Sequence, residues 1–352
     1  MTSRRHPPRA SRSRQDGVAL LTVLVIVAIA TVLSVGMLRS QQQALLHAAG
    51  LFQQDQAWLY TQGAEDMVRE LLAEDLKEDR RSHREVDHPG EAWAQPFPPF
   101  PVEGGSIRAR VSDLQARFNL NRLGNAQDAG AADIFRQLLR NLALPDTLAP
   151  ALGDWIDADN EAQGSDGAEE DFYSRLAPPY RVANHPLSDI SELRLVKGFT
   201  PAIIARLRPH VCVLPAAAAL NVNTASPVVL SALGASLSPS AAAELAAQRP
   251  ARGYASVDEF LGQPVFNGLE SAAKERLGRQ LAVKSRYFEL VADADIGGRH
   301  SILHAVIARG DSGTLRITAR DFSQKVLAAA GAEASRGAGE PGAAHTDQDS
   351  LR

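Results

Sequence analysis

The chain has 352 residues, of which 45% are hydrophobic and only 5% aromatic, and its formal net charge is −4. This length leaves room for one or two domains beyond a membrane anchor. The small negative charge gives no sign of bulk affinity for nucleic acid. Cys212 is the only cysteine, so an intramolecular disulfide is excluded even in an oxidising compartment.

Residues 18–38 form an apolar segment without a single charge. As a helix these 21 residues are about 30 Å long, enough to cross the hydrocarbon core of a bilayer. The segment is too long for the apolar part of a secretory signal, and no Ala-x-Ala site follows it, so we expect a permanent anchor. Arginines in the lead-in place the N-terminus in the cytoplasm; they are Arg4, Arg5, Arg9, Arg12 and Arg14.

The apolar segment starts directly after a glycine, at the Gly17–Val18 junction. A short basic leader, a glycine and an uninterrupted apolar helix resemble the cleavage site of type IV prepilins and type II secretion pseudopilins. In those families a dedicated peptidase cuts after the glycine, so we predict processing between Gly17 and Val18. The alternative is a plain signal anchor that is never cut. Pilin-like helices usually carry a glutamate at the fifth mature position, which is Thr22 here.

Apolar residues recur every three to four positions from Leu45 to Leu71, and no proline occurs between Val18 and Pro89. This pattern predicts that the helix continues to about Asp79. A long helix that is half anchor and half packed on a globular head is also what the pilin resemblance implies. An ordinary coiled coil is the alternative.

Strand patterns occur at residues 105–113 and again only near the end, at 287–293, 301–308 and 314–319. The Pro-rich stretch 89–101 is predicted to be a loop. Strands separated by ~170 mostly helical residues indicate an α+β fold, in which a small antiparallel sheet carries a large helical insert.

Residues 154–171 contain eight carboxylates and no lysine or arginine. Such a density repels itself unless a cation neutralises it, and hard oxygen ligands beside glycines suit Ca²⁺. Asp157, Asp159 and Glu161 have the spacing of the first three EF-hand ligands, but Ala162 stands where that loop needs glycine. An irregular calcium loop is therefore one interpretation, and a solvated acidic loop is the other. Neighbouring aromatic residues favour a packed loop.

Two patterns, at residues 190–207 and 220–233, each predict two short helices joined by a hairpin; the second is followed by helical patterns at 241–249 and 253–261. They resemble helix-hairpin-helix (SAM-like) modules, which often bind the DNA backbone. Their hairpin normally presents Gly-x-Gly amides to a phosphate, whereas Thr200 replaces the second glycine in the first copy. The scaffold is predicted to be retained and the nucleic-acid chemistry lost. A membrane-anchored DNA receptor remains the alternative function.

The order of these features is specific, because it includes Asn119–Leu123, Asp154–Asp159, Gly167–Glu169, Tyr180–Asn184 and Leu220–Ala225. Residues 12–325 resemble the general secretion pathway protein K family, the large minor pseudopilin of type II secretion. The resemblance implies a type IV pilin-like fold, a long N-terminal helix on a small antiparallel sheet, with an inserted all-α domain that binds calcium. It also implies assembly with the I and J minor pseudopilins at the pseudopilus tip, and no enzymatic activity.

Calcium ligands are predicted in the insert. Glu170 stands where the family has aspartate. The candidates are Asp157, Asp159, Glu161, Glu169, Glu170, Asp171 and, as a carbonyl ligand, Asn184. The resemblance further implies prepilin peptidase, methylation of the new N-terminus, the major pseudopilin and the inner-membrane assembly platform as processing and assembly partners. The bulk of the chain is expected in the periplasm, without nucleic acid.

The predicted organisation follows the chain from a cleaved leader to a disordered tail. The segments are the leader 1–17, the membrane helix 18–38, the periplasmic helix and first sheet part 39–117, the insert 118–285, the terminal strands 286–325 and the tail 326–352.

Overall fold

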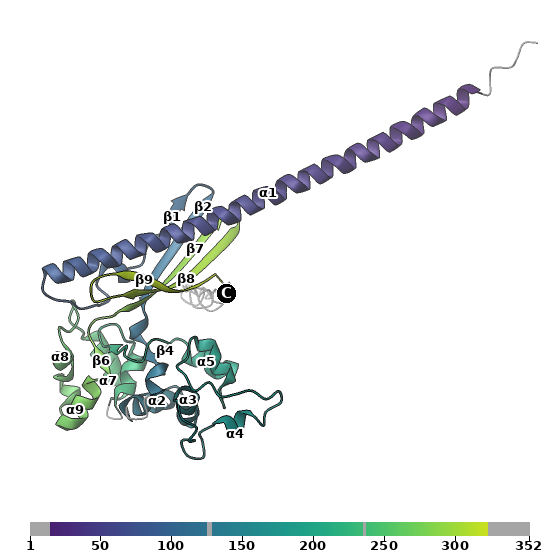
Figure 1. Ribbon diagram of the computed structural model, residues 1–352. Helices are drawn as coiled ribbons and strands as arrows, with labels where there is room; N and C mark the ends of the chain where they lie inside the picture. Colours follow the sequence, from purple (N-terminus) through teal and green to yellow (C-terminus); the bar gives the residue numbers. More distant parts are fainter. Residues whose placement is uncertain (1–14, 125–128, 235–236, 323–352) are drawn as a thin grey trace, which may run out of the picture.

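The computed structural model describes residues 15–124, 129–234 and 237–322. Most of the predicted leader and the tail 326–352 lie outside these residues. Helix α1, Gln15–Arg81, has 67 residues and is therefore about 100 Å long, which confirms the predicted continuous helix. Its first half projects away from the rest of the molecule (Figure 1). Within the described ranges, α1 is the one helix that is long and apolar enough to span a membrane.

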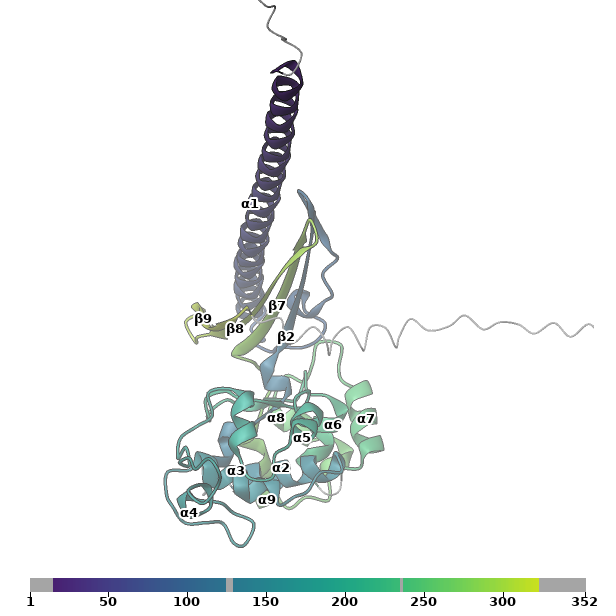
Figure 2. The same cartoon turned by 90° about the vertical axis from the view of Figure 1, so that its right-hand side faces the viewer.

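The second half of α1 packs on a five-stranded antiparallel sheet with the order β1-β2-β7-β8-β9 (Figure 2). Val68 and Leu72 of α1 are fully buried against Phe288 and Leu290 of β7. The four predicted strands are confirmed with small changes at their ends. The strands are β1 Phe100–Val102, β2 Gly105–Asp113, β7 Tyr287–Ile296, β8 Arg299–Arg309 and β9 Leu315–Asp321.

The loop predicted at 89–101 is wrong in part, because it contains the short helix η1 (Ala92–Ala94) and the first residues of β1. Strand β1 pairs only with β2 and forms the edge of the sheet. An edge strand tolerates Pro101, since its missing N–H faces away from the ladder. The prolines of this stretch therefore led to the prediction of a loop where a short strand exists.

The chain leaves the sheet after Asp113 and returns at Tyr287, and the intervening ~170 residues form a helical body below the sheet (Figure 2). The predicted insert bounds, 118 and 285, fall inside this interval. The body has its own hydrophobic core. Its α-helices are α2 Ala129–Asn141, α3 Leu148–Ile156, α4 Glu170–Tyr173, α5 Pro201–Leu207, α6 Pro227–Leu230, α7 Pro239–Ala247, α8 Val257–Leu261 and α9 Ser271–Gly278.

The insert is not all-α, so that part of the prediction is wrong. It contains two parallel ladders of two-residue strands, which are too short to show a sequence period. They pair β3 Phe118–Asn119 with β4 Val211–Cys212, and β5 Leu220–Asn221 with β6 Leu281–Ala282.

Each ladder pairs the first strand of a repeated unit with its last strand. Each unit contains an Asn-x-Asn motif. Asn121 accepts the N–H of Leu187 at 2.7 Å and donates to its carbonyl at 2.9 Å. Asn223 does the same for Tyr254, at 2.7 and 3.1 Å. Leu187 and Tyr254, the residues bound in this way, each lie just before a helical hairpin. The two motifs therefore fix the two halves of the insert through nonlocal hydrogen bonds.

The predicted hairpins consist of short helices. In the first unit, the 3-10 helix η4 (Ile190–Leu195) is followed by α5, and in the second, α6 is followed by η5 (Ser231–Leu233) and α7. The pair α8 and α9 follows Tyr254 as η4 and α5 follow Leu187, so it is the counterpart of the first hairpin.

Candidate metal centre

The acidic run begins where α3 ends. Asp157 follows the last residue of α3 in an extended conformation, with φ −71° and ψ 172°. Glu169 lies at the N-cap of α4, also extended, and its side chain makes no capping hydrogen bond. The loop between these two residues therefore brings two ends of the acidic run together.

Asp154 shapes this loop from the last turn of α3. Its fully buried carboxylate accepts the N–H of Ala168 at 2.7 Å and that of Gln163 at 3.2 Å. A Cβ atom at Gly167 would lie 2.2 Å from the Asp154 carboxylate, so only glycine fits there without displacing the carboxylate. Asp154 was not among the predicted ligands, and the structure gives it the role of holding the loop.

Three of the predicted ligands converge. Asp157, Asp159 and Glu169 each offer a carboxylate oxygen, and these oxygens lie within 4.8 Å of one another. Asp157 Oδ1 and both carboxylate oxygens of Glu169 are buried without a hydrogen-bond partner. Buried polar atoms are normally satisfied, so these oxygens are positioned as the ligands of a cation would be.

Asn184 contacts the acidic loop from the segment that follows α4. Its backbone is left-handed, with φ 48°, and its N–H donates to the Trp155 carbonyl at 3.1 Å. Its side-chain amide donates to the Asp159 carbonyl at 2.9 Å. Its Oδ1 is also buried and unpaired. The predicted carbonyl ligand is thus held against the acidic loop.

The neighbouring carboxylates in this group make ionisation of one another less favourable. Burial, followed by the charges of Asp154, Asp157 and Asp159, raises the pKa of Glu169 to about 7. Burial and the neighbouring Asp159 raise the pKa of Asp157 as well. A bound cation would reverse both effects, because an opposite charge favours the ionised form.

The other three candidates lie outside this group. Glu161 is exposed, and Glu170 accepts the N–H of Val182 at 3.2 Å. Asp171 is 93% exposed in its side chain and pairs with Arg175 at 3.4 Å. Glu170 and Asp171 begin α4 and lie on different sides of the helix from the Glu169 carboxylate, since successive helical residues are turned by about 100°.

The loop is packed, as its aromatic neighbours indicated. Trp155 and Tyr173 are buried edge to face, with ring centroids 5.0 Å apart. Lys197, in the first hairpin, donates its ammonium to the carbonyls of Asp166 and Gly167 at 3.2 and 2.9 Å. Its backbone N–H donates to the Tyr173 hydroxyl at 3.2 Å. Nothing in the local sequence pairs Lys197 with the loop, so sequence analysis missed it.

The donor set fits Ca²⁺. Oxygens that share one ion at about 2.4 Å are at most about 4.8 Å apart, which the three carboxylates satisfy. Carboxylate and amide oxygens are ligands that Ca²⁺ prefers. Asp157, Asp159, Glu169 and Asn184 would hold the ion, and the ion would neutralise the loop.

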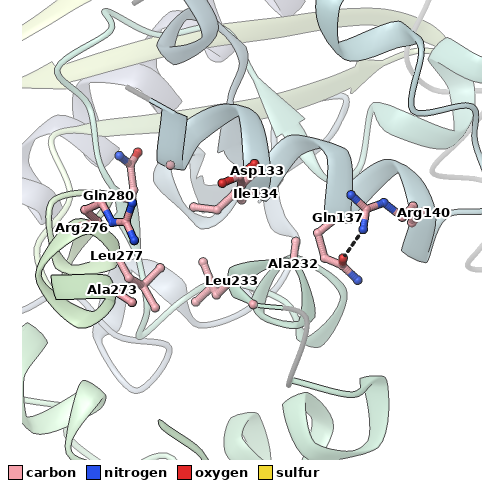
Figure 3. A pocket seen from close by; sticks show the side chains of 12 residues that line it. Asp133, Ile134, Gln137, Arg140, Ala232, Leu233, Ala273, Arg276, Leu277 and Gln280 are labelled. Atoms are coloured by element: carbon pink, nitrogen blue, oxygen red, sulfur yellow. Dashed lines mark hydrogen bonds between the residues drawn. The ribbon is translucent and has the colours of Figure 1, made fainter. Parts of the chain in front are cut away.

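A separate cavity of about 370 Å³ lies between α2 and α9 (Figure 3). Asp133 and Gln137 line one wall, and Arg276 lines the opposite wall. Asp133 pairs with Arg136 at 3.4 Å. Among the described lining residues, Asp133 is the only carboxylate, so the cavity gathers no acid–base pair.

Comparisons with known proteins identify the family. The family models described as "Type II secretion system (T2SS), protein K" match residues 116–216 and 220–284. A protein K from Pseudomonas aeruginosa is 38% identical over 321 residues, covering 89% of this chain and 94% of the relative. The chain belongs to the type II secretion system protein K family. This confirms the resemblance predicted from the sequence.

Other members of the protein K family agree with this assignment. The Aeromonas hydrophila protein K is 33% identical, with 86% of this chain and 95% of the relative covered. A crystal structure of the GspK-GspI-GspJ complex from enterotoxigenic Escherichia coli contains a chain that is similar to this one, with a TM-score of 0.69 and 30% identity. The similarity covers 81% of this chain and 99% of that chain. The two family-model matches correspond closely to the two Asn-x-Asn units of the insert.

Proposed function

We propose that this chain is a minor pseudopilin of the type II secretion system that caps the periplasmic pseudopilus together with the I and J minor pseudopilins and helps to initiate its assembly. The supporting observation is its similarity along nearly the whole length of a chain from a GspK-GspI-GspJ complex. Residues 18–38 anchor it in the inner membrane with a short cytoplasmic N-terminus, and the bulk of the chain is periplasmic. Prepilin peptidase, the major pseudopilin and the assembly platform are its further partners.

A position at the tip is supported by the membrane helix. Thr22 occupies the place of the usual pilin glutamate, and its hydroxyl donates to the Ala19 carbonyl at 2.8 Å. Its polar group is therefore satisfied within its own helix, whereas a glutamate in the bilayer requires a partner. The resemblance assigns that partner to the next subunit above, which a terminal subunit lacks. The insert of ~170 residues supports the same position, since so large a head would clash in a tightly wound filament.

Gold labelling of assembled pseudopili with an antibody to the insert tests the tip position. We expect label at one end only. Label distributed along the shaft would contradict the proposal.

The exposed apolar face of α1 is the proposed contact with the partner helices. Beyond the membrane segment, Phe52 and Leu59 are 69% and 59% exposed, and Leu45, Leu46 and Leu51 are exposed as well. Leu45, Phe52 and Leu59 are spaced seven residues apart and therefore lie on one side of the helix. Large apolar side chains exposed together on an exported domain indicate a protein interface.

Leu59→Lys should reduce copurification with the I and J minor pseudopilins at least about tenfold, because it buries a charge in the contact and each ~1.4 kcal/mol is a factor of ten. Gln54→Lys, a charge of the same kind on the neighbouring exposed surface, is the matched control and should leave copurification unchanged. Equal yields for wild type and Leu59→Lys would argue against this face.

DNA binding is disfavoured by the hairpin geometry. The Lys197 backbone N–H donates to Tyr173 and its ammonium to the acidic loop. The lysine of the hairpin that would receive a phosphate is thus engaged by a carboxylate-rich segment. A duplex-DNA shift assay should show no tight, salt-sensitive binding, which phosphate recognition would produce.

A further inference from the structure

A buried arginine joins three parts of the molecule. Arg309 ends β8, and its side chain is 1% exposed. Its guanidinium donates to Asp75 of α1 at 3.2 Å, to Asp87 of the following loop at 2.5 Å, and to the Ser285 carbonyl at 2.8 Å. Ser285 lies where the insert returns to the sheet. Arg309 therefore links the long helix, the sheet and the insert.

Two carboxylates tie the insert to this point. Asp87 accepts the Ser285 N–H at 2.6 Å, and its own N–H donates to the Val283 carbonyl at 2.9 Å. Asp113, the last residue of β2, accepts the hydroxyls of Ser285 and Thr224 at 2.6 and 2.5 Å. The insert is thus held on the sheet through hydrogen bonds to buried carboxylates.

The charges at this junction do not balance. Asp75, Asp87 and Glu91 each offer an oxygen within 4.8 Å of the others. Their side chains are 9%, 0% and 11% exposed, and Arg309 is the cation in direct contact with Asp75 and Asp87. If all three carboxyls were ionised, the group would hold two uncompensated buried charges, which is costly. A proton shared among the three lowers that cost.

Glu91 makes its hydrogen bonds to neutral donors. It accepts the Trp93 indole N–H at 2.6 Å and the His88 backbone N–H at 3.1 Å. The His88 ring accepts the Gly90 N–H on Nδ1 at 3.1 Å, and its Nε2 lies 3.5 Å from Glu91 Oε1. Burial lowers the pKa of His88, which favours the neutral imidazole. Unlike Asp75 and Asp87, Glu91 has no contact with Arg309, so its ionised form is the least stabilised of the three.

The charged and titratable groups around the junction come from every element packed there. They are Asp75, Asp79 and Arg80 of α1, Arg84, Glu85, Asp87, His88 and Glu91 of the loop, Asp113 of β2, Arg252 and Lys284 of the insert, and Arg309 of β8. Lys284 is in contact with Glu85 rather than with the buried group.

We propose that Asp75, Asp87 and Glu91 form a proton-dependent lock that holds the insert on the sheet and releases it when the group becomes fully ionised. With a proton present, one carboxyl donates to its neighbour and the junction is closed. When the proton leaves, repulsion among the carboxylates loosens Asp87, and with it the backbone hydrogen bonds to Val283 and Ser285.

The pH range follows from the environment of each group. Burial and the charge of Asp87 raise the pKa of Asp75 to about 7. Burial and the charges of Asp75 and Asp87 raise the pKa of Glu91 to about 8. A raised carboxyl pKa contributes stability that is complete below its ordinary value and is lost as pH rises through the folded value. The lock is thus closed in mild acid and opens between about pH 7 and 8.

Hydrogen exchange of the full chain in detergent, expressed as protection factors, tests this lock. Between about pH 6 and pH 9, we expect protection of residues 283–287 to fall at least about tenfold, since one pKa unit is a factor of ten. Protection in the middle of β8, residues 301–306, should not change. The double variant Asp75→Asn/Glu91→Gln keeps the shape of both side chains and removes both raised titrations, so its protection at 283–287 should vary far less with pH.

Asp66→Asn is the matched control, because it removes a carboxylate from the exposed side of α1 and should behave like wild type. Three results would overturn the lock: constant protection in wild type, a fall of the same size in Asp75→Asn/Glu91→Gln, or restoration of protection at pH 9 by added CaCl₂. The last result would instead identify the group as a cation site.

Discussion

Replacing Gly17 with valine should leave the 17-residue leader on essentially every molecule, whereas wild type should begin at Val18. A bulky side chain at Gly17 fills the space beside the bond that the peptidase must reach. Helix α1 begins at Gln15, so this bond lies in the first turn, where the backbone N–H groups have no partner within the helix and the turn unwinds at little cost. The glycine and the loose terminal turn together make the bond accessible.

The intact mass of protein extracted from membranes that contain the peptidase measures this effect. Gly36→Val is the matched control, because it is the same change in the same helix and an added Cβ there meets no atom within 4 Å. It should be processed like wild type. A wild-type protein that retains Met1, or a Gly17→Val variant that loses the leader, would contradict the cleavage site.

The elements with a long period could be predicted from the sequence. Helix α1 combines a continuous apolar run at 18–38 with apolar residues every three to four positions from Leu45 to Leu71, and β2 alternates buried and exposed positions toward its end. The elements that were not predicted are too short to show a repeating pattern of apolar and polar residues. Strand β1 has three residues, one of them a proline, and the ladders inside the insert have two residues per strand. Their partners are more than 60 residues away for both insert ladders, so only the folded chain defines them.

The candidate site could be located from the sequence but not resolved into ligands. The density of carboxylates marked the loop, and the family resemblance added Asn184. Which carboxylates point inward depends on the turn from Asp157 to Glu169, and this turn is fixed by Asp154, Gly167 and Lys197. Two of these contacts join residues 14 and 30 positions apart. The same limit applies to the Arg309–Asp87 pair, whose members are 222 positions apart.

Removing calcium should lower the melting temperature of the exported domain by roughly 5–10 °C. A ligand that binds only the folded state adds ~2.7 kcal/mol at 100 times its dissociation constant. Each kcal/mol shifts the melting temperature by about 2–4 °C for a domain of about 150–250 residues. Without the ion, the unpaired oxygens of Asp157 and Glu169 remain buried together. Thermal melting with calcium and with a chelator measures the difference.

Variants of the loop separate a calcium site from a merely acidic loop. Glu169→Gln removes a buried charge, so with chelator it should melt at or above the wild-type temperature, and added calcium should no longer stabilise it. Asp159→Ala should likewise lose the calcium shift. Asp171→Asn is the matched control, because Asp171 is exposed and paired with Arg175, and it should keep the full shift. A wild-type curve that chelator leaves unchanged, or a Glu169→Gln variant that calcium still stabilises fully, would count against the site. Loss of the shift in Asp171→Asn would instead extend the ligand set to the start of α4.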